Sequence, residues 1–302
     1  MKSKKETDRS VQSRQFSAWL PDIILAVILI VLTVIMVYPF IYEIFMSLSD
    51  PVQIVKHRGL LAKPIGFTTI AYQVVFSTPQ IWTGFANTLF IMVVGLAINL
   101  VLTSFGAYFL CQHDVMFYKP IMMFILITMY FSGGLVPFYL TVRNMGLYDN
   151  IWAVILPAAV STYNLILLRS YFSTIPKSLQ ESVMIDGGGH FTILFKIYVP
   201  LCKPAMMVMV LYYAVGHWNS WFNAFIFLKD NTKFPLQLVL RNMLKDDSQV
   251  LLKAVQSYAG YDTLKETVKA AMIIVSTVPF LCIYPFLQKH FESGMMIGSL
   301  KE

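Results

Sequence analysis

The sequence predicts an all-α polytopic membrane protein that crosses the bilayer six times, and two observations predict this. Hydrophobic residues make up 57% of the 302 residues and charged residues only 13%, whereas a soluble domain is about 45–50% apolar and about 25% charged. The shortage of charge is the sharper signal, because a charged side chain is costly on a surface that faces lipid. The chain also contains six largely apolar stretches of about 20 residues, the length that a spanning helix needs.

Polar segments separate the six predicted spans. The spans are residues 23–45, 82–110, 120–140, 151–168, 205–228 and 268–287. The second is longer than a bilayer requires, which predicts that it is tilted or partly outside the hydrocarbon core. Several prolines lie in the spans or at their ends, and they predict kinked helices packed in a bundle. Small residues at Gly95, Ala97, Gly106 and Ala107 would let helices approach closely.

Titratable side chains are almost absent from the spans. Glu43 and Lys269 lie near span ends, and His217 is the one titratable residue well inside a span. Ion-coupled carriers and channels usually need carboxylates or paired charges at membrane depth. A membrane-embedded transferase would need clustered acidic or histidine residues, and the five histidines are scattered. The pattern disfavours both classes and favours a transporter whose energy enters elsewhere.

The sequence contains no motif for nucleotide binding, disulfide bonding, zinc binding or nucleic-acid binding. The sequence has no GxxxxGK[ST] loop for the phosphates of a nucleotide. Its three cysteines are far apart and form no CxxC, so they indicate neither a disulfide framework nor a zinc site. The net charge of +7 comes with no aromatic-basic motif for nucleic acid. We therefore expect no catalytic residues, no metal and no nucleic-acid partner.

Basic residues predict the orientation in the membrane. The N-terminal tail, residues 1–22, carries five of them, namely Lys2, Lys4, Lys5, Arg9 and Arg14. We therefore place the N-terminus in the cytoplasm, and six spans then put the C-terminal tail, residues 289–302, there too. The loop before Pro120 and the loop 170–203 fall inside, while segments 46–81, 141–150 and 229–267 fall outside. The last of these is basic, but long loops cross the membrane largely regardless of charge.

The loop 170–203 differs from the others because it can form two short helices joined by glycines. Pro176-Lys177-Ser178 predicts a helix start, with Glu181 three residues after Ser178 as in a capping box. The helix would run from 179 to about 185 and stop at Gly187-Gly188-Gly189. A second helix, about 191–198, would end before Pro200. Such a hairpin suits docking against another protein, and an ordinary interfacial hairpin is the alternative.

The residues of this loop resemble a known motif. The run Glu181-Ser182-Val183, followed by Asp186-Gly187-Gly188 and later by Pro200 and Pro204, resembles the EAA motif of binding-protein-dependent ABC importer permeases. The spacings match over 24 positions. Ser182 and Val183 replace the two alanines of the pattern, and Leu194 stands where phenylalanine is common. In that family this loop binds the ATPase, so the resemblance implies an ATPase-coupling role for Glu181, Ser182, Asp186, Gly187, Gly188, Pro200 and Pro204.

Other stretches resemble the carbohydrate-uptake, MalG-like branch of that family. They are NTLFIMVVGLAINLVLTSFGAYFL from Asn87 and HWNSWFNAFIFL from His217. Closer still is the similarity of SGGLVPFYLTVRNMGLYDNIWAVILP from Ser132, and of the C-terminal GMMIGSLKE, to the LplC/YtcP-like permeases. The resemblance covers residues 87–302, and implies a permease core over 82–288 that follows the first span and outer loop, 23–81.

The resemblance also implies partners and cargo. It implies a second related permease, a cytoplasmic ATPase dimer that carries ATP and Mg, an extracellular sugar-binding lipoprotein, and a place in the bacterial cell membrane. The implied cargo is a complex oligosaccharide. A permease for another small solute is the alternative within the family, and an ion-coupled transporter is the alternative outside it.

Residues of the fifth span are candidates for sugar contact. On one continuous helix, Trp218 and Trp221 would share a face, and Asn219 and Asn223 the adjacent face. Aromatic faces stack on sugar rings, and amides bind hydroxyls. Tyr130 is a weaker candidate, with Asn87, Tyr163 and Asn164. The alternative is that the tryptophans form an interfacial belt.

Overall fold

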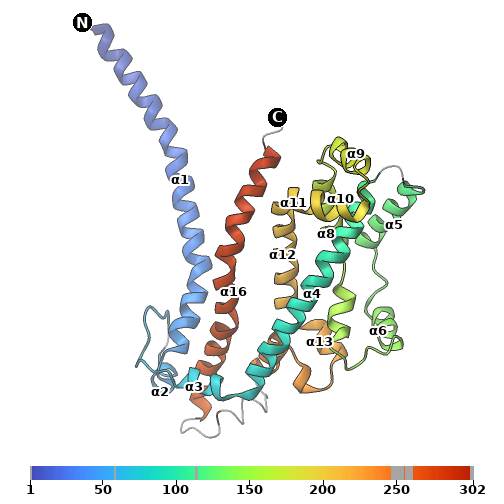
Figure 1. Ribbon diagram of the computed structural model, residues 1–302. Coiled ribbons are helices and arrows are strands. Elements are labelled where there is room, and N and C mark those ends of the chain that lie inside the picture. The colour runs from blue at the N-terminus through green and yellow to red at the C-terminus, as the bar shows by residue number, and fades with distance from the viewer. Residues whose placement is uncertain (1, 58, 113–114, 246–254, 256–260, 300–302) are drawn as a thin grey trace. The chain divides into compact units, whose positions relative to one another are not determined.

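A computed structural model describes residues 2–57, 59–112, 115–245, 255 and 261–299 (Figure 1). Every regular element within these residues is a helix. The chain divides into two compact units. Unit 1 comprises Met1–Gln73 and Tyr258–Ile274, and unit 2 comprises Val74–Ser257 and Val275–Glu302.

Unit 1 is dominated by α1 (Lys2–Ser47), which includes the predicted first span. Its segment Pro21–Ser47 is long and apolar enough to cross a membrane. The side chains of this segment are largely exposed, as expected of a surface covered by lipid. The helix begins within the predicted tail rather than at residue 23. Of the predicted C-terminal tail, residues 300–302 lie outside the described residues.

After α1 the chain folds back on the end of that helix. The Asp50 Oδ1 atom accepts hydrogen bonds from the amides of Val52 and Gln53 and so caps α2 (Pro51–Ile54). The Tyr38 hydroxyl accepts a hydrogen bond of 3.0 Å from the Leu61 amide. These bonds satisfy backbone groups that have no helical partner. The unit continues into α3 (Ile70–Ser77) and includes the start of α16 (Tyr261–Ser299).

Unit 2 is built around α4 (Pro79–Cys111), the second predicted span. α8 (Thr162–Phe172) and α12 (Lys203–Trp218) pack against it. Their shared core contains Leu168, Phe172 and Met209, all fully buried. Close approach depends on small residues of α4, as predicted. A Cβ atom on Gly95 would lie 2.5 Å from Nε2 of His217, and one on Gly106 would lie 2.8 Å from Cδ1 of Leu165.

The predicted spans 120–140 and 205–228 are each divided into two helices. The first of these segments divides into α5 (Tyr118–Tyr130) and α6 (Leu135–Asn144), which are bent by 113°. Gly134 lies in the bend with φ +86°, a left-handed conformation that glycine adopts without a Cβ penalty. The second divides into α12 and α13 (Phe222–Phe227).

The fourth predicted span, 151–168, also contains a break. It comprises α7 (Trp152–Ile155), the 3-10 turn η1 (Leu156–Ala158) and α8, with a bend of 45°. The described residues contain two uninterrupted helices that could span, or up to five spans if each bent pair crosses once. The sixth predicted span, 268–287, lies within α16, which is not among those five. The count of six spans therefore remains a prediction.

Different loops lie at the two ends of α4 (Figure 1). Near its amino end, Asn87 Nδ2 donates to the carbonyl of Thr232, within η3 (Asn231–Lys233), and to that of Phe234, which follows η3. At its carboxyl end, Gln112 exchanges two hydrogen bonds with Gln180 of α9 (Lys177–Ile185). A helix of 33 residues is about 50 Å long, so the loop 170–203 and the segment after Leu228 lie at opposite ends of unit 2.

Candidate functional site

The helix α9 contains Glu181 and Ser182 and ends where the glycines predict. Gly187 has φ +79°. Its amide donates to the Met184 carbonyl at 3.0 Å, and the Gly188 amide donates to the Val183 carbonyl at 2.8 Å. This is the Schellman arrangement that satisfies the last carbonyls of a helix.

The two glycines are needed for different reasons. At Gly187 the left-handed backbone disfavours residues that carry a side chain, although a Cβ atom there would meet nothing within 4 Å. At Gly188 a side chain has no room, because a Cβ atom would lie 2.5 Å from Cγ1 of Val183. The chain therefore turns sharply after Asp186, which is exposed beside the turn.

The predicted capping box is absent. Pro176 is the N-cap residue of α9 and makes no side-chain cap bond. Ser178 lies inside the helix, where its carbonyl accepts a hydrogen bond of 2.9 Å from the Ser182 hydroxyl. The helix begins instead after Pro176, whose fixed φ and extended backbone lead the chain into the first turn.

The two faces of α9 differ. Its inner face has Val183 packed on the core of unit 2 and Gln180, whose Oε1 accepts a hydrogen bond from the Tyr198 hydroxyl. Its outer face has Glu181 and Ser182 exposed, with Ile185 85% exposed. Leu179 and Met184 of the same helix and Phe191 further along the loop are also exposed, and exposed apolar side chains are a feature of protein-binding surfaces.

Pro200 and Pro204 lie on either side of a bend. α10 (His190–Ile193) continues as a π-helical turn, Leu194–Tyr198, and as α11 (Val199–Leu201). The prediction that the second helix ends before Pro200 is therefore wrong by one turn. The bend to α12 is 85° and falls at Cys202. Proline removes a helical hydrogen bond, so it favours irregular turns and helix starts at these places.

A hollow of about 460 Å³ lies beside the carboxyl end of α12. It is lined from α8 and α12 by Asn164, Tyr212, Tyr213 and His217, and from the following break and α13 by Asn219, Trp221 and Asn223. Its volume is within the range of small-ligand sites, about 300–1,000 Å³. The mixture of amides and aromatic rings can bind hydroxyls and stack on sugar rings.

Three predicted substrate-path residues therefore lie together, and two do not join them. Trp218 is 3% exposed and packs edge-on against Phe85. Tyr130 is 77% exposed at the end of α5 and does not line the hollow. The break after Trp218 is the reason that Trp218 and Trp221 do not share a helical face. Trp221 instead stacks with Arg241 of α14 (Leu236–Leu244), whose guanidinium carbon lies 4.5 Å from the ring centre.

Buried polar side chains line the helix break beside the hollow. Asn99 Nδ2 donates to the carbonyls of Ala158 and Ala159 at 2.6 and 2.8 Å. The Tyr213 hydroxyl accepts from the Ser161 amide at 3.1 Å and bonds to the Thr103 hydroxyl at 2.7 Å. Broken helices are tolerated at membrane depth only where such groups satisfy the backbone.

Sequence reasoning missed Asn99 and Tyr213, and it noted His217 without a role. His217 is 4% exposed, and its Nε2 lies 2.6 Å from the Asn99 Oδ1 atom. His217 and Asn99 both occur within predicted spans that are otherwise largely apolar. Because intramembrane polar groups usually pair, this was the signal that could have found them together.

Comparisons with known proteins decide the family. The chain is 38% identical over 280 residues to the polygalacturonan/rhamnogalacturonan transport system permease protein YtcP of Bacillus subtilis, covering 93% of this chain and 98% of that protein. It is also 38% identical to Protein LplC of the same organism, over 88% of this chain and 89% of that protein. The chain belongs to the family of ABC sugar-transport permeases. No model of a protein family matches it.

A solved structure agrees with this assignment to the permeases. A bacterial ABC transporter involved in the import of the acidic polysaccharide alginate matches with a TM-score of 0.84 and 33% identity, over 91% of this chain and 98% of that chain. The resemblance to the LplC/YtcP-like branch is thereby confirmed. The permease is a transport subunit and not an enzyme, and ATP is hydrolysed on a separate subunit.

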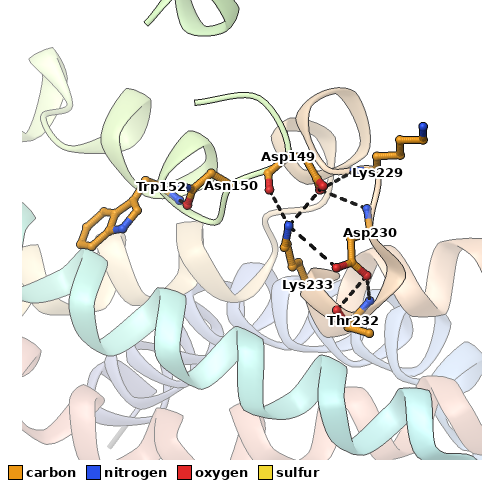
Figure 2. Close-up of polar contacts among 7 residues, drawn as sticks. All are labelled: Asp149, Asn150, Trp152, Lys229, Asp230, Thr232 and Lys233. Atoms are coloured by element: carbon orange, nitrogen blue, oxygen red, sulfur yellow. Dashed lines mark hydrogen bonds and ion pairs between the residues drawn. The ribbon is translucent and has the colours of Figure 1, made fainter. Parts of the chain in front are cut away.

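Far from α9, the permease has an ionic clamp between two loops (Figure 2). Lys233 Nζ lies 3.1 Å from Asp149 Oδ2 and donates to the Asp149 carbonyl at 2.7 Å. Asp149 Oδ1 accepts from the amides of Lys229 and Asp230 at 3.0 and 3.1 Å. These bonds lower the pKa of the Asp149 carboxyl, and the bond from the Asp230 amide has the largest effect. The clamp joins the segment before α7 to the segment after α13.

Proposed function

We propose that the permease translocates complex oligosaccharides, delivered by an extracellular sugar-binding lipoprotein, by alternating access driven by a cytoplasmic ATPase dimer. The cargo is inferred from the similar proteins, whose names describe transport of polygalacturonan, arabinooligosaccharides and alginate. All of these are carbohydrate polymers or their fragments. A second, related permease would complete the transmembrane path.

The exposed outer face of α9 is the observation that carries the coupling part of the proposal. Glu181 and Ser182 project from a short helix that a Schellman turn at Gly187 and Gly188 holds rigidly. We expect this face to sit in a groove of the ATPase, with Glu181 opposite a basic group. The exposed Ile185 would be buried there on assembly.

The elements after α9 offer a path from the ATPase to the hollow. α10, the π turn and α11 lead through the bend between Pro200 and Pro204 into α12. The last turn of α12 brings His217 to the wall of the hollow. Closure of the ATPases would move α9, and a packed helix moves as a rigid body. The same displacement would thus reach Asn219, Trp221 and Asn223, the proposed sugar contacts.

This mechanism requires the α9 end of unit 2 to face the cytoplasm. The clamp of Asp149 and Lys233 would then face the cell exterior, in agreement with the predicted outer segments 141–150 and 229–267. We propose that both chain termini, with the tails 1–22 and 289–302, are cytoplasmic. The exposed apolar side chains of α1 would contact membrane lipid, in the bacterial cell membrane.

Disulfide cross-linking tests the docking surface. A Ser182→Cys variant, in a chain whose exposed Cys282 is replaced by serine, should cross-link to a cysteine placed in the groove of the ATPase. The matched control is Ser173→Cys, an exposed residue just after α8. Cross-linking of Ser173→Cys as fast as of Ser182→Cys, or labelling of Ser182→Cys from outside intact cells, would contradict the proposal.

A further inference from the structure

The hydrogen bonds around Asn99 fix the proton of His217. Asn99 Nδ2 faces two carbonyl oxygens, those of Ala158 and Ala159, and a carbonyl oxygen can only accept. The amide group of Asn99 is therefore oriented with Oδ1, an acceptor, towards His217 Nε2 at 2.6 Å. It follows that Nε2 carries the proton and that, in the neutral ring, Nδ1 is an acceptor.

The imidazole also has little freedom to turn. Its Nε2, Cε1 and Cδ2 atoms are the nearest atoms to the position of a Cβ on Gly95, at 2.5, 2.6 and 3.1 Å. The ring thus fills the space left by the missing side chain of Gly95 on α4. The hydrogen bond and the packing together hold the ring in one orientation.

Nδ1 is the polar atom of this ring that is left for a ligand. Among the described residues, the hydrogen bond of the ring is the one from Nε2 to Asn99. His217 also belongs to the wall of the hollow, beside Asn219 and Trp221. A fixed acceptor in the wall of this hollow is suited to a hydroxyl donor, because preorganised groups lose little entropy on binding.

We propose that His217 is a sugar-binding residue whose neutral Nδ1 accepts a hydrogen bond from one cargo hydroxyl, and that Asn99 is a positioning residue that fixes the required tautomer. This inference rests on the proposed sugar cargo. It adds a specific atom, a direction for the hydrogen bond, and a residue of α4 that does not itself contact the cargo. Carbohydrate hydroxyls are the ligand chemistry that this acceptor selects.

Two substitutions of His217 separate the binding role from a structural one. In His217→Gln the side-chain amide nitrogen can take the place of Nε2 and keep the bond to Asn99, but the acceptor at Nδ1 is lost. In His217→Asn a polar atom remains near the place of Nδ1, but the bond to Asn99 is lost. A purely structural histidine would therefore tolerate glutamine better, whereas a sugar-binding histidine would tolerate asparagine better in cargo recognition.

The experiment uses the complete transporter in proteoliposomes, with saturating binding protein. The cargoes are trisaccharides of galacturonic acid, of alginate and of arabinose, each compared with derivatives that carry one O-methyl group. A methyl ether cannot donate a hydrogen bond. In the wild type we expect methylation of one particular hydroxyl to slow transport about 3–10-fold. In His217→Gln the parent and that derivative should move at equal rates, and in His217→Asn the difference should persist.

The ratio of the two rates isolates the permease, because the same binding protein delivers both sugars to every variant. If His217→Gln discriminates between parent and derivative as the wild type does, the inference is overturned. A wild type that is insensitive to methylation at every hydroxyl overturns it as well. A wild type that moves none of the three trisaccharides contradicts the proposed function itself, which distinguishes the two failures.

Discussion

At the carboxyl end of α4, the helix α9 leaves the side chains of Glu181, Ser182 and Ile185 exposed. Along the middle of α4, Asn99 and Tyr213 bind the backbone of a helix break, and near its amino end Asp149 and Lys233 clamp two loops. One region thus has a capped helix whose outer side chains are exposed, and the other pairs its buried polar groups within the chain. The contrast suits a surface that binds a partner and a core that holds a solute site in shape.

The polar core should be the region most sensitive in stability. In Asn99→Leu the Ala158 and Ala159 carbonyls and His217 Nε2 lose their partner, so we expect a loss of about 2–5 kcal/mol in unfolding free energy. Unfolding in mixed micelles measures it. Asn144→Leu, at an exposed site at the end of α6, is the control and should change stability by less than about 0.5 kcal/mol. Equal effects would remove the contrast between core and surface.

The packing of α4 on α12 gives the next largest effect. In Gly95→Ala the new Cβ atom would overlap the His217 ring, so we expect a loss of about 1–3 kcal/mol. Gly216→Ala on α12 is the matched control, because a Cβ there meets nothing within 4 Å. It should raise stability by about 0.5–1 kcal/mol through the helix propensity of alanine. The same micelle assay reads both variants, and a neutral Gly95→Ala would show that the ring is mobile.

The clamp of Asp149 and Lys233 should contribute less to the free energy of unfolding, and its contribution should depend on pH. The folded-state pKa of Asp149 is lowered below its unfolded value of about 3.9. Its contribution is therefore complete above about pH 4 and is lost as pH falls through the folded value. The exchange of the Lys229 and Asp230 amides should report this loss as the pH falls below about 4, after correction for intrinsic rates.

An Asp149→Asn variant provides the comparison for the clamp. Asparagine tolerates the positive φ of +56° at this position and can still accept the two amide bonds, but it cannot titrate. We expect its corrected exchange to show no acid step. If the wild type and this variant share the same step, another group is responsible.

Substitution on the outer face of α9 should have the smallest effect on stability. We expect Ile185→Ser to change unfolding free energy by less than about 0.5 kcal/mol, yet to weaken co-purification of the ATPase. Val183→Ser, on the packed inner face, is the control and should destabilise the permease. If Ile185→Ser is the more destabilising of the two, the outer face is part of the core.

The sequence was sufficient for α9 because its determinants are local. Gly187 adopts the left-handed backbone of the turn, and its hydrogen bonds are made by residues within the same short segment. The spacing of Gln180 and Val183 places both on the inner face. The break after Trp218 was not predictable in this way. The run 205–228 is largely apolar, and its polar residues His217, Asn219, Ser220 and Asn223 do not by their order alone show that the chain leaves the helix at Asn219.

Partners far apart in the chain were equally beyond local reasoning. Asn99 binds the Ala158 carbonyl and His217, which follow it by 59 and 118 residues. Lys233 reaches Asp149 across 84 residues. Such pairs are fixed by the packing of helices. For Asn99 and His217, the rarity of polar residues within apolar spans could have drawn attention to them, whereas Asp149 and Lys233 lie in polar segments and offer no such signal.

Transport by the reconstituted complex with Gly187→Val tests the central claim most directly. Valine at φ +79° should distort the turn that holds α9, while Gly189→Ala, where the backbone has φ −85° and a Cβ meets nothing within 4 Å, should leave it intact. We predict that Gly187→Val abolishes sugar uptake and the stimulation of ATP hydrolysis by loaded binding protein, although the permease still inserts into the membrane. Normal uptake by that variant would contradict the account.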